Sequence, residues 1–280
     1  MASIEKYTAP ETLEEVTDLL AEGYALMFAG GTDVMPQTRS GVREFQPYLI
    51  NIARVAGIRG ISREGSSIRI GALTTLTDIL ESALLKEHAP VLVAAADCFA
   101  SGQVRNSATL GGNLCNASPA ADMAIPLLLL DAEVELQSGA RRCVPLSDFF
   151  LGPGKTWLNP TEILTHVRFD APPDGFRARF VKFGVRPALD ISVVSVGVAG
   201  VENAVFGITR VAFGAAAPTP LRGEKTEAFL EGRLLDEDTI AAAAGIAQEE
   251  VSPISDVRGS AWYRRELVRT LTERALRDVA

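Results

Sequence analysis

The chain has 280 residues, of which 47% are apolar and 22% are charged. These values are typical of globular proteins and provide enough material for two modest domains with substantial cores. The net charge of −8 argues against a nucleic-acid or anionic-membrane partner, because phosphate binding depends on clustered Lys and Arg. Cys98, Cys115 and Cys143 share no C-x-x-C spacing. This excludes a disulfide framework and a four-thiolate metal site within the chain, and it favours a reducing compartment.

Targeting and membrane signals do not stand out in the sequence. Residues Met1 to Lys6 lack the basic-then-apolar order of a secretory signal. The longest apolar runs, such as Ile125 to Leu130, are far shorter than the ~20 residues that span a bilayer. We therefore expect a cytoplasmic protein without a membrane span.

The first 55 residues or so predict a small α/β unit. Thr8 is the expected cap of a helix whose apolar residues recur at helical spacing as far as Leu20, and Gly23 ends it. Residues 24–28 and 48–52 are short apolar runs typical of buried strands. The expected order is helix, strand, glycine-rich turn and strand.

The central part of the chain alternates strand and helix patterns. We expect helices over 77–85, 89–99 and 124–130, and strands over 67–72, 132–137, 141–145 and 162–169. The segment Pro172-Pro173-Asp174-Gly175 is the strongest linker signal in the chain. We therefore predict a first domain over 1–173, subdivided near residue 55, and a second domain over 174–280.

The second domain has a different pattern. Three strands are expected over 177–186, 191–201 and 206–213, followed by helices over 224–230, 236–248 and 262–276. Strands followed by helices predict an antiparallel sheet packed with helices. The fold class expected for the chain is therefore α+β, with a two-part α/β ligand-binding region before this C-terminal domain.

Two glycine turns are the main candidates for a binding site. Ala29-Gly30-Gly31-Thr32-Asp33 directly follows a predicted strand, and Thr109-Leu110-Gly111-Gly112-Asn113 lies far downstream. A glycine pair lets successive backbone N–H groups converge into a nest that holds phosphate, and two nests could hold a pyrophosphate. Thr32 and Thr109 add hydroxyl donors, while Asn113 and Asp122 could reach ribose or ribityl hydroxyls.

Simpler interpretations stay open for these residues. A plain tight turn would explain either glycine pair alone, and neither fits G-x-G-x-x-G or G-x-x-x-x-G-K-[ST]. The phosphate hypothesis therefore depends on the two turns acting together. His88 and His166 have no metal-ligand spacing and suit surface or structural roles. Cys115 could line a pocket, although a small buried apolar side chain would serve equally.

The second turn also belongs to a longer recognisable run. Residues 103–113, continued through Ser118-Pro119-Ala120-Ala121-Asp122, resemble the signature of the FAD-binding subunit of molybdenum hydroxylases. That family includes the medium subunit of carbon monoxide dehydrogenase and the flavin domain of xanthine dehydrogenase. Residues 29–33 resemble its first pyrophosphate motif, and Arg186-Pro187-Ala188-Leu189-Asp190 resembles the loop near its flavin ring. The resemblance covers essentially the whole chain.

The resemblance implies a set of FAD contacts and no catalytic or metal-binding side chain. Residues 29–33 and 109–113 would hold the FAD pyrophosphate, Asp122 would bind cofactor hydroxyls, and Lys182 would lie near the flavin. Lys182 could instead be an exposed strand residue. The implied contacts are Phe28, Ala29, Gly30, Gly31, Thr32, Asp33, Ser101, Thr109, Leu110, Gly111, Gly112, Asn113, Asp122, Leu164 and Lys182. Phe99-Ala100 stands where the family often has Ile-Gly.

The function implied by the resemblance is electron transfer within a larger complex. Substrate would be hydroxylated at a molybdopterin cofactor on a large subunit, electrons would cross two 2Fe-2S clusters on a small subunit, and FAD in this chain would pass them to an acceptor. A dimer of such heterotrimers is expected. Three cysteines cannot supply the four ligands of a cluster, which excludes the hydroxybenzoyl-CoA reductase branch with its additional cluster.

Two other functions remain open. A stand-alone FAD-dependent oxidase or dehydrogenase would need its own substrate pocket and a side-chain base near the flavin. A non-catalytic scaffold subunit would bind a nucleotide only for stability. The sequence does not encode the substrate of the complex or its electron acceptor, because substrate selection would occur on another subunit.

Overall fold

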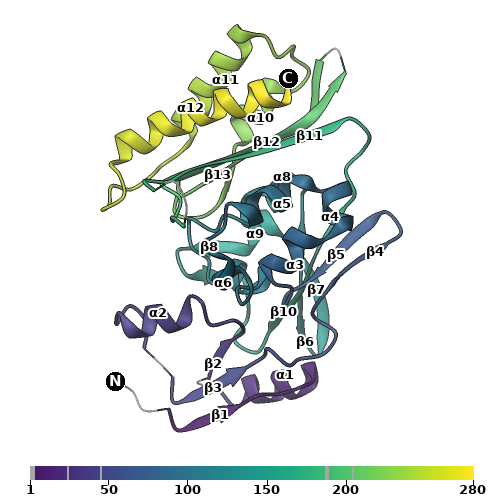
Figure 1. Cartoon of the computed structure of the whole chain (residues 1–280), viewed down its shortest axis with the longest axis vertical. Helices are drawn as coiled ribbons and strands as arrows, with labels where there is room; N and C mark the ends of the chain where they lie inside the picture. Colours follow the sequence, from purple (N-terminus) through teal and green to yellow (C-terminus); the bar gives the residue numbers. More distant parts are fainter. Residues whose placement is uncertain (1–3, 24, 45, 187–188, 204) are drawn as a thin grey trace.

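The computed structural model describes residues 4–23, 25–44, 46–186, 189–203 and 205–280. The chain forms three units stacked along its long axis, in the order of the sequence (Figure 1). Within these residues, no helix combines the length and the apolar character needed to cross a membrane.

The N-terminal unit is a three-stranded parallel sheet with the order β1-β3-β2. Its elements are β1 (Lys6–Thr8), α1 (Leu13–Ala21), β2 (Ala25–Phe28), α2 (Val34–Arg39) and β3 (Tyr48–Asn51). The expected cap at Thr8 is wrong, since Thr8 ends β1. Thr12 caps α1 instead, because it forms a capping box with Glu15.

The central unit is a five-stranded antiparallel sheet with the order β4-β5-β10-β6-β7. Its strands are β4 (Ile61–Glu64), β5 (Ser67–Gly71), β6 (Glu133–Ser138), β7 (Ala140–Pro145) and β10 (Ile163–Asp170). A small hairpin, β8 (Phe150–Gly152) and β9 (Lys155–Thr156), lies beside it. Inward-facing side chains alternate along β5, where Ile68 and Ile70 are fully buried.

Seven helices of the central unit connect these strands and cover the sheet. They are α3 (Leu76–Glu81), α4 (Ala83–His88), α5 (Pro90–Asp97), α6 (Gly102–Arg105), α7 (Leu110–Cys115), α8 (Ala124–Leu129) and α9 (Leu146–Phe149). The prediction of a single helix over 77–85 is wrong, since this segment forms two helices and the first begins at Leu76. Thr75 caps α3, and extended backbone at Ser82 separates α3 from α4, which Ser82 caps.

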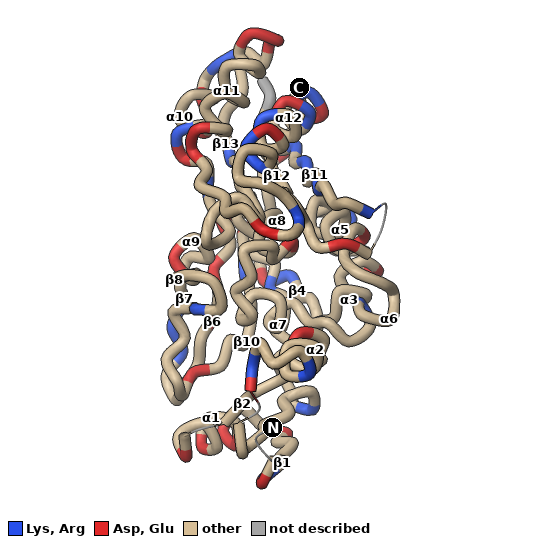
Figure 2. Tube along the Cα trace, turned by 90° about the vertical axis from the view of Figure 1, so that its left-hand side faces the viewer, with Lys and Arg blue, Asp and Glu red and all other residues tan. Residues whose placement is uncertain are grey.

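The C-terminal unit is an antiparallel sheet with the order β11-β12-β13-β14. Its elements are β11 (Phe176–Phe183), β12 (Val194–Asn203), β13 (Val205–Gly214), β14 (Leu221–Arg222), α10 (Glu224–Leu230), α11 (Glu237–Glu250) and α12 (Ala261–Val279). Charged residues recur along α12 in Figure 2, while its buried residues include Leu267, Val268 and Leu271. The α+β fold class predicted from the sequence is confirmed.

Residues 171–175 connect β10 of the central unit with β11 of the C-terminal sheet. The next two strands differ from the expected bounds, since β11 ends at Phe183 rather than 186 and β12 begins at Val194 rather than 191. The division of the chain into functional domains at 173/174 stays a prediction.

Candidate functional site

A cleft between the N-terminal and central units brings the two glycine turns together. We call it the cofactor cleft. It contains about 920 Å³ of empty space, counting the part open to solvent. The predicted site residues that line it are Phe28, Ala29, Gly30, Gly31, Thr32, Asp33, Thr109, Gly111, Gly112, Asn113 and Leu164. A cleft of this size and position is typical of a cofactor or ligand site.

Gly30 allows the two halves of the cleft to approach each other. A Cβ atom at this position would lie 1.7 Å from the carbonyl oxygen of Ser107, two residues before the second turn. No side chain fits there without displacing backbone. The sequence therefore needs glycine at residue 30 because the first turn lies against residues 107–108.

The first turn presents a row of unused backbone donors. Gly31 has φ +71°, in the left-handed region that favours glycine. Within the described residues, the N–H groups of 29–34 donate no hydrogen bond to the protein. Consecutive free N–H groups in such a turn form an anion-binding concavity, so this turn suits a phosphate or pyrophosphate group.

The second turn is built differently. The Gly111 N–H donates to the Ala72 carbonyl oxygen at 2.9 Å, and the Leu110 N–H donates to the Thr74 carbonyl oxygen at 3.0 Å. Thr109 caps α7, because its hydroxyl accepts from the Gly112 N–H at 3.1 Å. The expectation of a nest of free N–H groups at each turn is therefore wrong for the second turn, since the N–H groups of residues 110–113 already have protein acceptors.

Asn113 supplies the polar group that the second turn offers to the cleft. Its Oδ1 atom is buried and has no hydrogen-bond partner in the structure. Buried polar atoms are nearly always paired, so this oxygen is suited to accept a hydrogen bond from a bound group. A dinucleotide with hydroxyls and a pyrophosphate fits the two turns, which provide an acceptor on one side and N–H donors on the other.

Two titratable groups of the cleft have perturbed acidity. Partial desolvation by the surrounding protein raises the pKa of the Asp33 carboxyl, although the residue is accessible from the cleft and the charge of Arg43 opposes the shift. Burial raises the pKa of the Cys115 thiol to about 12. Cys115 is therefore a neutral thiol in the cleft wall rather than a reactive thiolate.

The other predicted contacts lie outside the cleft lining. Ser101 caps α6 by accepting a hydrogen bond from the Val104 N–H at 3.3 Å. Leu110 is fully buried in the core. Whether these two residues influence cofactor binding stays a prediction.

Asp122 and Lys182 contact each other. The Lys182 Nζ lies 2.7 Å from Asp122 Oδ2, and their side chains are 10% and 5% exposed, respectively. The interpretation of Lys182 as an exposed strand residue is therefore wrong. Lys182 Nζ also donates to the Cys98 carbonyl oxygen at 3.3 Å, one residue before Phe99, which lines the cleft.

The loop expected near the flavin ring is held by its own side chains. Asp190 accepts a hydrogen bond from the Arg186 N–H at 2.9 Å, and this bond is the main reason that the pKa of Asp190 is lowered. Pro187 and Ala188 lie outside the described residues.

The cleft contains residues that the sequence did not single out, among them Arg43, Leu73 and Phe99. Phe99 lies in a turn where Ala100 has φ +38° and the Arg105 guanidinium donates to the carbonyl oxygens of Phe99 and Ala100 at 2.8 and 3.0 Å. The sequence feature that could have indicated Phe99 is the pair Phe99-Ala100, which stands where the family often has Ile-Gly. An aromatic side chain there supplies an apolar wall.

Among the described residues, no group of three or more His, Cys, Asp or Glu side chains could hold a metal ion. His166 has a structural environment, since its Nδ1 lies 2.9 Å from an Arg69 nitrogen and Arg69 also binds Glu135. Burial lowers the pKa of His166.

The fold is α+β, and the cleft between its first two units suits an extended, phosphate-bearing cofactor. Residues 2–172 match the family model described as the FAD binding domain in molybdopterin dehydrogenase. Residues 179–279 match the CO dehydrogenase flavoprotein C-terminal domain. The chain belongs to the family of FAD-binding medium subunits of molybdenum hydroxylases, the flavoprotein subunits of xanthine dehydrogenase and carbon monoxide dehydrogenase type enzymes.

Individual relatives match over nearly their whole length. The chain is 35% identical to the xanthine dehydrogenase FAD-binding subunit of Escherichia coli O157:H7, over 99% of this chain and 97% of that protein. It is 32% identical to the carbon monoxide dehydrogenase medium chain of Hydrogenophaga pseudoflava, over 97% and 95% respectively. A solved carbon monoxide dehydrogenase from Hydrogenophaga pseudoflava superposes with a TM-score of 0.95 at 30% identity, over 99% of this chain and 97% of that one.

Proposed function

We propose that this chain is the FAD-carrying electron-transfer subunit of a heteromeric molybdenum hydroxylase. It would take electrons from the iron-sulfur clusters of a partner subunit and pass them to an external acceptor. The observation that supports this most is the cofactor cleft, which is lined both by residues 29–34, whose N–H groups are free, and by Asn113, whose side-chain oxygen has no partner among the described residues. FAD, when bound, supplies the redox chemistry, and the protein sets its position and electrostatic surroundings.

Each part of the cleft has a proposed role in holding FAD. The N–H groups of residues 29–33 would bind the pyrophosphate, with Thr32 and Thr109 adding hydroxyls. The Asn113 oxygen would accept a cofactor hydroxyl. Gly111 and Gly112 would keep the second turn thin enough for close approach, and apolar walls would come from the side chains of Phe28, Leu164 and Phe99.

The proposed assembly contains two further subunits. A small subunit would carry two 2Fe-2S clusters and a large subunit would carry the molybdopterin cofactor, with two such heterotrimers forming a dimer in the cytoplasm. The relatives named as medium chains support a multisubunit complex. Cys98, Cys115 and Cys143 are free thiols, and three thiols cannot ligate a four-cysteine cluster. Residues 1–173 would be the FAD-binding domain, subdivided near 55, and 174–280 the C-terminal domain.

Flavin content tests the central proposal. The full chain, purified with FAD present and then desalted, should retain flavin absorption bands at close to one FAD per chain. In the assembled complex, substrate should reduce this flavin, and the added acceptor should reoxidise it. A chain that stays colourless under conditions that preserve bound FAD would refute the proposal.

The alternatives predict different behaviour. A stand-alone flavin dehydrogenase would need a base in the cleft, and Asp33, with its raised pKa, is the carboxyl among the described lining residues. Bleaching of the flavin by an organic substrate added to the isolated chain would favour this function. A scaffold subunit would keep its flavin oxidised while the assembled complex turns over.

A further inference from the structure

Helix α8 connects the cofactor-binding region to the C-terminal sheet. All six of its residues are buried. Its outer face packs on strands β12 and β13, where a Cβ atom at Gly197 or Gly214 would lie 2.8 or 3.2 Å from a side-chain atom of Ile125. The sheet therefore lies close against the helix, and the residues at the two ends of α8 meet polar groups of the sheet.

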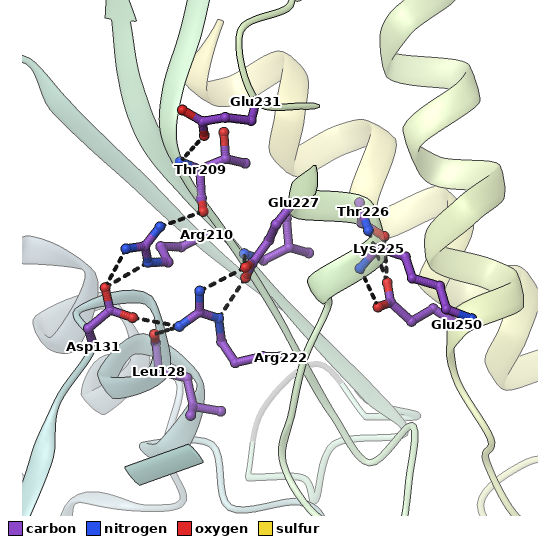
Figure 3. A network of polar contacts seen from close by, with 11 residues as sticks. Leu128, Asp131, Thr209, Arg210, Arg222, Lys225, Thr226, Glu227, Glu231 and Glu250 are labelled. Carbon is purple, nitrogen blue, oxygen red and sulfur yellow. Dashed lines mark hydrogen bonds and ion pairs between the residues drawn. The ribbon is translucent and has the colours of Figure 1, made fainter. Parts of the chain in front are cut away.

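The C-terminal end of α8 is fixed by a cluster of charges. Asp131 accepts hydrogen bonds from the Arg210 Nε at 2.7 Å and from an Arg222 nitrogen at 2.6 Å (Figure 3). Arg222 also donates to the Leu128 carbonyl oxygen at 3.3 Å and to the Glu227 carboxylate at 2.6 and 2.8 Å. The guanidinium groups lower the pKa of Asp131 despite opposing desolvation. This cluster anchors the sheet to the central unit.

The N-terminal end of α8 is fixed by Asp122, which is 4% exposed. Both carboxylate oxygens are bound by the C-terminal unit, since Ser192 Oγ donates to Oδ1 and Lys182 Nζ donates to Oδ2. Ser192 is itself 1% exposed and lies just before β12. A buried carboxylate needs such partners, because a buried charge with an incomplete set of hydrogen bonds is strongly unfavourable.

We propose that Ser192 is a positioning residue that fixes the carboxylate of Asp122 and, through it, the ammonium of Lys182 at the edge of the cofactor cleft. This rests on the proposed function. Without the hydroxyl, the Asp122 carboxylate keeps a single side-chain donor and is free to turn. Lys182 then loses its fixed place, including its bond to the carbonyl beside Phe99. The C-terminal unit thus completes the cofactor site without lining the cleft.

The test compares two substitutions of equal volume in the full chain. Ser192→Thr keeps a hydroxyl, whereas Ser192→Val replaces it with a methyl group. The Val variant should bind FAD about tenfold more weakly than the Thr variant, because the displaced Lys182 ammonium would no longer support the cofactor, and should shift the flavin midpoint potential. Thermal unfolding should show the apo Val variant to be less stable than the apo Thr variant, since only the Val variant leaves the buried Asp122 carboxylate short of a donor. The flavin midpoint potential, measured at full FAD occupancy, separates the positioning role from this loss of stability.

Ser195→Ala is the matched control. Ser195 is fully buried three residues away, but its hydroxyl has no hydrogen-bond partner among the residues that the structure describes. Its loss should leave FAD affinity and potential unchanged. Equal affinities and equal potentials for the Thr and Val variants would overturn the positioning role, as would a Ser195→Ala effect as large as that of Ser192→Val. Absence of flavin from the wild-type chain would instead refute the proposed function itself.

Discussion

The contact between the first glycine turn and residue 107 makes Gly30→Ala the sharpest perturbation of the cleft. The added Cβ would lie 1.7 Å from the Ser107 carbonyl oxygen and 2.5 Å from its carbon. An ordinary carbon–oxygen contact needs about 3.3 Å. The two turns must therefore separate by roughly 1.5 Å, because neither contacting atom belongs to a flexible side chain.

The size of the effect follows from this geometry. Overpacking against a rigid neighbour costs about 1–3 kcal/mol of folding stability. The same displacement moves the free N–H groups of residues 29–34 away from the Asn113 side of the cleft, so a ligand that contacts both sides cannot satisfy both. We expect FAD affinity to fall by at least about tenfold, which corresponds to roughly 1.4 kcal/mol.

Gly102→Ala is the control for Gly30→Ala, because a Cβ at Gly102 meets nothing within 4 Å. FAD titration of the apo chains, followed by flavin fluorescence, gives the affinities, and chemical denaturation without FAD gives the stabilities. Gly102→Ala should match the wild type in affinity. Wild-type affinity and stability in Gly30→Ala would refute the close approach of the two turns.

Three further outcomes follow from single residues. Asn113→Ala should weaken FAD binding by about 1 kcal/mol but cost the apo chain little, because its Oδ1 has no partner to lose; equal affinities by calorimetry would contradict this. A neighbouring guanidinium lowers the pKa of Glu162 from 4.5 to about 2, so its stabilisation is present above pH 4.5 and is lost as pH falls toward 2. In Glu162→Gln the denaturation midpoint should depend less on pH across that window than in the wild type, and an unchanged pH dependence would count against this. Burial holds the pKa of Cys115 near 12, so a thiol reagent at pH 8 should label the exposed Cys98 and Cys143 in the native chain, and Cys115 only after unfolding; rapid labelling of all three thiols would disprove it.

Local patterns were enough to predict most elements of the fold. Alternation of apolar residues identified β5 and the β6–β7 hairpin, because one face of each strand is buried. The errors occurred where two local signals compete. Thr8 and Thr12 both precede the apolar face of α1, and only the Glu15 side chain, completing the capping box, selects Thr12. Ser82 caps a new helix within a run that has continuous helical spacing.

Properties of the site that depend on distant segments could not be predicted. The two glycine turns look alike in sequence, yet the Gly111 N–H is used by Ala72, a residue on another segment of the central unit. The ion pair between Asp122 and Lys182 joins residues 60 positions apart. Pairings of this kind are set by how distant segments pack on one another, and the chain pattern alone contains no information on that packing.

The apolar clusters of the chain do not coincide with its three units. The largest one combines central residues such as Ile125 with Phe180, Ala199 and Ala212 of the C-terminal sheet. During synthesis from the N-terminus, α8 is therefore made well before the strands that cover it, so a nascent chain would expose this apolar helix until β13 emerges from the ribosome. A ribosome-bound chain ending near residue 175 should bind chaperones more readily than one long enough for β13 to have left the ribosome.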